Sequence, residues 1–162
     1  MIYIRRAAAA DWEAIWPIFQ AVVAGGDTYV YAPDTSEAQA HALWMPEGVS
    51  TYVAREQGEV VGTFLVRPNQ PGLGSHVCNA AFMVKPSQSG RGVGRAMDLY
   101  ALAEAKAAGY TAMQFNFVVS CNTRAVALWE SLGFSIIGTI PKAFQHREMG
   151  LVDAHIMHRF LD

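Results

Sequence analysis

The stretch that decides the fold is AAFMVKPSQSGRGVG, residues 80–94. Its first five residues are apolar and predict a buried strand, and the glycine-rich turn leads directly into an alanine-rich segment typical of a helix. A helix that begins at such a turn directs several backbone N–H groups at one point, and the glycines lack the β-carbons that would keep a phosphate away. Arg91 and Arg95 add positive charge. Taken alone, the turn fits an anion site or a flexible connection before an amphipathic helix.

Segments on both sides of this stretch alternate between strand and helix patterns. We expect strands over residues 2–5, 51–55, 60–66, 76–84, 111–119, 134–140 and 151–160. Helices are expected after Asp11, after Ser36, and over residues 93–108 and 122–132, and a polar loop over 142–149 joins the last two strands. This order predicts an α+β fold with helices on the faces of a sheet.

Composition and net charge limit which kinds of protein and partner fit the sequence. The 162 residues are 52% hydrophobic, which is enough for one core, so we expect a single domain over residues 1–162. A net charge of -2 argues against nucleic acid as a partner and favours a small molecule. No targeting signal or membrane-spanning run is visible, which predicts a soluble, cytoplasmic protein without a membrane partner. Cys78 and Cys121 are expected to be free thiols.

Two common phosphate-binding folds do not fit the turn. A P-loop requires GK followed by Ser or Thr, and this combination is absent. A dinucleotide-binding fold places its glycines after the first strand of repeated βαβ units, whereas this turn lies mid-chain after a hairpin. A coenzyme A site requires neither of these two patterns.

The succession of strand, glycine loop, helix, strand, Asn-led helix and closing Leu-Gly-Phe (132–134) resembles the GNAT superfamily of N-acetyltransferases. The resemblance implies a mixed, mostly antiparallel central sheet of about six to seven strands and acetyl-CoA as the acetyl donor. It also implies that the backbone of the loop binds the pyrophosphate of coenzyme A, a role that falls on Ser89, Gly90, Arg91, Gly92, Val93 and Gly94. Ser89 replaces the Gln or Arg that usually opens the motif, and Gln88 lies one position earlier.

The helix led by Asn122 resembles the second conserved GNAT segment, in which the Asn contacts the pantetheine arm. Asn122 is also a good N-cap residue, and the two roles are compatible. Many family members carry a Tyr where this chain has Trp129, and that phenol is often assigned as the acid for the departing thiolate. An indole cannot do this, so we interpret Trp129 as a packing residue.

Attack of an amine on a thioester builds negative charge on the carbonyl oxygen, so a backbone N–H near Met83 or Val84 is the expected stabiliser. No acyl-enzyme is required, which leaves Cys121 without a catalytic role. His76, His146 and Glu148 are candidates for a general base, and none stands out. We expect no metal, because no ligand cluster accompanies the other histidines.

Asn79 and Asn116 are amides embedded among apolar residues, so they either pair internally or face a ligand. Together with Asn122 and the segment 29–35, they resemble the proline-analogue acetyltransferases, which act on azetidine-2-carboxylate and related imino acids. That resemblance assigns catalytic positions to Asn79, Asn116 and Asn122. It implies that Tyr29, Tyr31, Asn79 and Asn116 bind a small amino or imino acid.

Two other functions fit the same features. Ser89 and Trp129 depart from the family pattern, which would suit a coenzyme A-binding regulatory module without turnover. A protein N-acetyltransferase would need an open groove, whereas the aromatic residues near Tyr29 favour a covered pocket. The apolar final strand and the habit of the family favour a homodimer.

Overall fold

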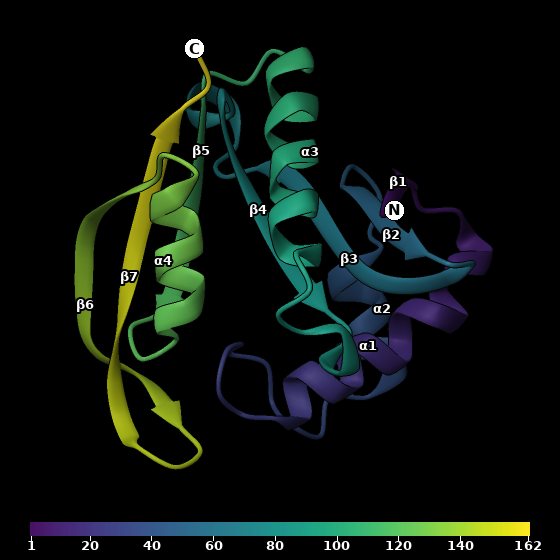
Figure 1. Ribbon diagram of the computed structural model, residues 1–162. Coiled ribbons are helices and arrows are strands. Elements are labelled where there is room, and N and C mark those ends of the chain that lie inside the picture. The colour runs from purple at the N-terminus through teal and green to yellow at the C-terminus, as the bar shows by residue number, and fades with distance from the viewer.

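Seven strands form one sheet in the computed structural model, which describes residues 1–162. The strands lie in the order β1-β2-β3-β4-β5-β7-β6, and all neighbours are antiparallel except β4 and β5 (Figure 1). The strands are β1 (Tyr3–Arg6), β2 (Ser50–Glu56), β3 (Glu59–Pro68), β4 (Val77–Val84), β5 (Ala112–Val119), β6 (Ser135–His146) and β7 (Gly150–Phe160). The helices are α1 (Trp12–Ala24), α2 (Glu37–Trp44), α3 (Val93–Ala107) and α4 (Thr123–Ser131). The predicted mixed, mostly antiparallel α+β sheet is confirmed.

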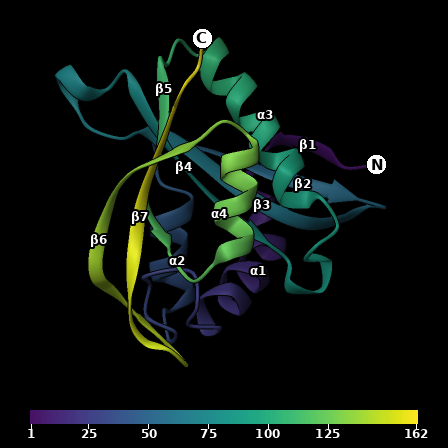
Figure 2. The ribbon, with the colours of Figure 1, turned by 60° about the vertical axis from the view of Figure 1, so that its left-hand side comes forward.

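Helices cover both faces of the sheet, with α1 and α2 on one face and α3 and α4 on the other (Figures 1 and 2). Each face has its own core. The α1 side buries Ile15, Phe19, Trp44, Leu65 and Met83. The α3 side buries Phe64, Met97, Met113, Phe115 and Met157, among others. Neighbouring strand residues therefore belong to different cores, as the alternation of side chains in a strand requires. No helix in the protein is both long and apolar enough to cross a membrane.

The first two helices begin in different ways. Ser36 caps α2: its hydroxyl accepts the N–H of Gln39 at 3.2 Å, and the Gln39 side chain accepts the N–H of Ser36 at 3.0 Å. Asp11 stands at the N-cap position of α1, as expected, but its side chain makes no capping hydrogen bond. Its carboxylate instead accepts the N–H of Ala8 at 2.6 Å and two hydrogen bonds from Arg5, which hold the pKa of Asp11 below its usual value.

Strands β4 and β5 are paired only where they begin. The register joins residues 77–79 to residues 112–114, after which the two strands separate (Figure 1). From Ala80 to Val84 the edge of β4 that faces β5 therefore has no strand partner. Such an edge presents the backbone N–H and C=O groups that normally bind another strand.

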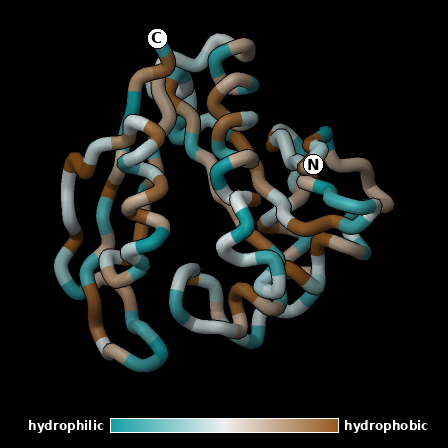
Figure 3. The backbone as a smooth tube through the Cα atoms, in the orientation of Figure 1, coloured by the Kyte–Doolittle hydropathy of each residue, from teal (hydrophilic) through white to brown (hydrophobic).

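The C-terminal hairpin is longer than predicted. Residues 142–146, expected in a polar loop, continue β6, and only residues 147–149 form the turn, which is hydrophilic in Figure 3. The register shifts between Ile140 and Phe144, and Lys142 takes a φ of +49° there. Phe144 is buried against Phe117, which explains why a polar stretch stays in the sheet. The apolar strand β7 is flanked by β5 and β6, so its edge is not free to join a second copy.

Candidate active site

The glycine-rich turn lies between the end of β4 and the start of α3, beyond the point where β4 has left β5 (Figure 1). A 3-10 turn, Pro86–Gln88, precedes it, and Gly90 and Gly92 take φ values of +77° and +84°. These left-handed conformations explain why glycine is required at both positions. A β-carbon on Gly92 would meet no heavy atom within 4 Å. The turn therefore leaves open space beside the free N–H groups of the first turn of α3, as a phosphate group requires.

Three arginines surround this turn. Arg91 and Arg95 are exposed, and each makes one long side-chain hydrogen bond, of 3.4 and 3.3 Å. Arg124, from α4, donates to the hydroxyl of Ser89 at 3.3 Å, and its guanidinium lies 3.5 Å from where a β-carbon on Gly90 would be. Sequence reasoning missed Arg124 because it lies on another helix. Its position two residues after Asn122 was the available signal.

The open edge of β4 is contacted by Tyr29. The Tyr29 hydroxyl donates to the carbonyl of Phe82 at 2.6 Å and accepts the N–H of Phe82 at 3.0 Å. Both backbone groups of Phe82 therefore point away from β3. In an antiparallel pair this direction alternates, so the N–H of Val84 also faces the open edge, whereas that of Met83 faces β3. The backbone N–H of Val84 therefore remains a candidate oxyanion donor. The N–H of Phe82 takes the place expected for that of Met83, whose side chain lies in the core.

Tyr29 belongs to a stack of aromatic rings on the α1 side of the sheet. Its ring is 5.9 Å from that of Tyr31, nearly parallel at 9°, and Tyr31 in turn stacks on Phe19 at 5.6 Å. Burial raises the pKa of both phenols, so they stay protonated. Tyr29 can therefore donate or accept a hydrogen bond but cannot act as a phenolate base near neutral pH.

Trp129 fills the space between the separated strands on the α3 side. Its ring centroid lies 5.3 Å from that of Phe82 on β4 and 4.9 Å from that of Phe115 on β5. It also packs against Phe134 at 6.4 Å. These contacts agree with a packing role for Trp129 and fix the distance between the two strands.

The two strand asparagines are both hydrogen-bonded within the protein. Asn79 is buried, and its side-chain N–H donates to the carbonyl of Gln114 at 2.9 Å, so this amide ties β4 to β5 where they begin to separate. Asn116 is exposed: it donates to the side chain of Asn69 at 2.7 Å and accepts from Gln114 at 3.1 Å. The sequence left two alternatives for these amides, internal pairing or contact with a ligand. Internal pairing describes Asn79, while Asn116 remains accessible to a ligand. Both lie on the sheet face that carries the two tyrosines.

Asn122 is the N-cap of α4, since its side chain accepts the N–H of Ala125 at 3.4 Å. The residue also borders a small cavity of about 140 Å³. The other residues that line it are Asp27, Thr28, Cys121 and His146. The cavity connects the loop after α1 with the start of α4 and the end of β6.

Of the three base candidates, only His146 lies in this cavity. Its Nδ1 accepts the backbone N–H groups of Glu148 and Met149 at 3.0 and 3.1 Å. The neutral ring therefore carries its proton on Nε2, which remains a hydrogen-bond donor. Glu148 is exposed in the turn after β6, and His76 is exposed before β4. The structure singles out no general base.

Both cysteines are free thiols. Cys78 is fully buried, and burial raises its pKa to about 12, so it is not a nucleophile near neutral pH. Cys121 is partly buried beside Asn122.

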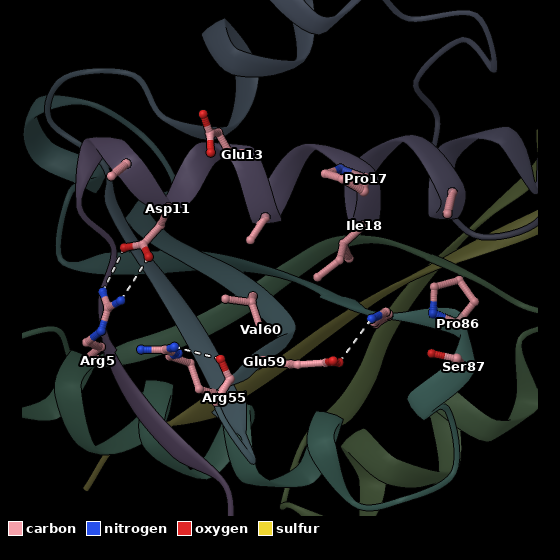
Figure 4. A pocket seen from close by; sticks show the side chains of 15 residues that line it. Arg5, Asp11, Glu13, Pro17, Ile18, Arg55, Glu59, Val60, Pro86 and Ser87 are labelled. Atoms are coloured by element: carbon pink, nitrogen blue, oxygen red, sulfur yellow. Dashed lines mark hydrogen bonds and ion pairs between the residues drawn. The ribbon is translucent and has the colours of Figure 1, made fainter.

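A larger hollow of about 720 Å³ lies between α1, the β2–β3 turn and the segment after β4, whose Pro86 and Ser87 precede the glycine-rich turn (Figure 4). Four of the charged side chains along it form two ion pairs. Arg5 contacts Asp11 at 2.7 Å, and Lys85 contacts Glu59 at 3.5 Å. Arg55 donates to the carbonyl of Gly58 at 2.7 Å. This hollow is larger than the cavity at Asn122, and the buried Nε of Arg55 on its wall has no hydrogen-bond partner.

Comparisons with known proteins agree with this geometry. A sequence model of the acetyltransferase (GNAT) family matches residues 12–134. The structure of a GCN5-related N-acetyltransferase from Kribbella flavida is 47% identical, covers 98% of this chain and 97% of its own, and superposes with a TM-score of 0.94. N-acetyltransferase aca1 of Schizosaccharomyces pombe is 38% identical over 60% of this chain and 47% of its own length, so the chain spans about half of that relative. A phosphinothricin acetyltransferase from Sinorhizobium meliloti, solved in complex with acetyl-CoA, shares the fold at 21% identity over 98% of this chain and 88% of its own, with a TM-score of 0.86.

Proposed function

The chain belongs to the GNAT family of acetyltransferases, and from this premise we propose that it transfers the acetyl group of acetyl-CoA directly to the amine of a small amino or imino acid, such as a proline analogue. The observation that carries the proposal is the open edge of β4. A loop suited to phosphate lies at one end of this edge, and aromatic and amide side chains lie on the α1 side of the sheet next to it.

In this proposal the donor lies along the open edge of β4. The backbone of residues 89–94 holds the pyrophosphate, with Arg91, Arg95 and Arg124 supplying charge. The N–H of Val84 and the side chain of Asn122 hold the pantetheine arm, which runs like an added strand. This assignment is supported by the direction of the Val84 N–H and by the place of Asn122 at the start of α4.

The acceptor amine, after its ammonium form has lost a proton to water, attacks the thioester carbonyl, so that a C–N bond forms, the C–S bond breaks and the thiolate leaves. The proton still held by the attacking nitrogen passes to water as the neutral amide forms. The N–H of Phe82 donates to the carbonyl oxygen as it becomes negative, a contribution of the size of an oxyanion-hole donor, about 10²- to 10³-fold in rate. Tyr29 stabilises the same group before substrate binds. Trp129 supplies no proton, and a thiolate with a pKa near that of cysteine, about 8.5, can leave without one.

The acceptor lies on the α1 side of the sheet in this proposal. Tyr29 and Tyr31 form a flat apolar wall, and Asn116 is an accessible amide on the same face of the sheet. Asn79 acts by holding β4 against β5 at the base of the pocket. A small ring with a polar substituent matches such a wall better than a long peptide does.

The test is thiol release from acetyl-CoA with a panel of acceptors: azetidine-2-carboxylate, proline, primary amino acids and short peptides. The proposal predicts release above the amine-free rate with free amino or imino acids. Coenzyme A binding without release from any acceptor would establish the non-catalytic regulatory module instead. Release with peptides alone would establish a protein N-acetyltransferase.

A further inference from the structure

Arg67 carries a charge that nothing in the protein neutralises. It is the ninth residue of β3, and its side chain is exposed. Its guanidinium makes no hydrogen bond or ion pair with any other residue. The partly buried arginine Arg5, by contrast, is paired with a carboxylate.

The register of the sheet places Arg67 beside the predicted acceptor pocket. Arg67 is opposite Asn79 in the β3–β4 pair, and Asn79 is opposite Gln114 in the β4–β5 pair. Residues opposite each other share a face of the sheet. Leu65, two residues before Arg67, packs in the α1-side core, so this row of three polar side chains lies on the α1 side. The row crosses the sheet where β4 and β5 begin to separate.

Arg67 also acts electrostatically on the aromatic residues of this face. Burial raises the pKa of Tyr31, and the positive charge of Arg67 opposes that rise. Tyr31 stacks on Tyr29, and the hydroxyl of Tyr29 bonds to the backbone of Phe82. A cation therefore lies at one end of an aromatic wall whose other end is the proposed oxyanion donor.

The polar groups that accompany Arg67 are neutral. Asn69, Asn79, Gln114 and Asn116 form hydrogen bonds among themselves or to the backbone, and none bears a negative charge. An unpaired guanidinium among amides and aromatic rings suits a carboxylate, because its planar N–H groups match the two carboxylate oxygens.

We propose that Arg67 binds the carboxylate of the acceptor and thereby selects amino and imino acids over amines that lack a free carboxylate. The inference rests on the proposed function, because it assigns a specificity residue to the same site. Arg67 contacts the acceptor but takes no part in bond making.

The test compares binding of an imino acid with binding of its amide, for example proline and prolinamide, by calorimetry in the presence of coenzyme A. Arg67→Gln should weaken proline binding about 10- to 100-fold, the effect of losing charge-assisted hydrogen bonds. It should leave prolinamide unchanged, and Arg67→Lys should restore part of the affinity. Lys106→Gln, an exposed lysine on α3, is the matched control for the change in charge and should bind proline like the wild type.

Equal weakening of proline and prolinamide in Arg67→Gln would overturn the inference, as would wild-type protein that binds neither compound or prefers the amide. The proposed function can be disproved independently of the role of Arg67. If wild-type protein binds proline in an Arg67-dependent way but releases no thiol from acetyl-CoA, the carboxylate site stands and the acetyl transfer does not.

Discussion

Replacing Gly92 with alanine separates the strain of the loop from its contact with a ligand. Gly92 has a φ of +84°, and a β-carbon there would meet no heavy atom within 4 Å. The substitution therefore causes strain without a clash, at a cost of about 1–2 kcal/mol. Gly58, in the β2–β3 turn, is a matched control, because it has a φ of +83° and equally open surroundings. Both variants should lose about 1–2 kcal/mol of unfolding free energy in urea denaturation.

The two variants should differ in acetyl-CoA binding. The methyl group of Gly92→Ala lies on the open side of the turn, where the pyrophosphate is expected, whereas that of Gly58→Ala lies in a different loop. Loss of one hydrogen bond to a charged group costs about 1.5–3 kcal/mol, which raises Kd about 10- to 150-fold. Calorimetric titration with acetyl-CoA measures this directly. If both variants bind as tightly as wild type, or if Gly58→Ala is weakened equally, the turn is not the phosphate site.

Two further substitutions test buried polar groups. Asp98 is fully buried without a hydrogen-bond partner, and burial raises its pKa from 3.8 to about 7, although Arg159 opposes the rise. Between these pH values the folded protein holds a proton that the unfolded chain releases, so stability should fall as the pH rises from about 4 to 7. Asp98→Asn should remove this dependence and raise stability above about pH 7 by roughly 2–4 kcal/mol in urea denaturation; an unchanged pH profile would disprove the assignment. Thr63→Val removes the acceptor, at 3.0 Å, of the buried Trp44 indole N–H. It should cost about 1–3 kcal/mol of unfolding free energy, and a variant as stable as wild type would show that water satisfies the indole.

Local sequence patterns predicted most of the fold because most elements carry their own start and stop signals. Ser36 begins α2, and Gly109 and Gly133 follow α3 and α4 with positive φ. The errors arose where a partner outside the local helix or strand pattern decides. Arg5 takes the carboxylate of Asp11, and burial of Phe144 against Phe117 keeps a polar segment in β6.

Only part of the candidate site could be predicted from the sequence, because its residues come from separate elements of the fold. The glycine turn and Asn122 follow a recognisable order along the chain. The choice of Phe82 over Met83 depends on which N–H groups face β3, a property of pairing that the sequence does not reveal. Arg67 and Arg124 are single charges that only the sheet register and the packing of α4 bring to the site.

The most direct test of the account follows an isotopically labelled acetyl group from acetyl-CoA by mass spectrometry, with azetidine-2-carboxylate or proline as acceptor. Direct transfer predicts that the label appears on the nitrogen of the acceptor, in equal amount to the free coenzyme A released, and never on the protein. Label that accumulates on a protein side chain, or that stays on acetyl-CoA while the protein binds it, would contradict the account.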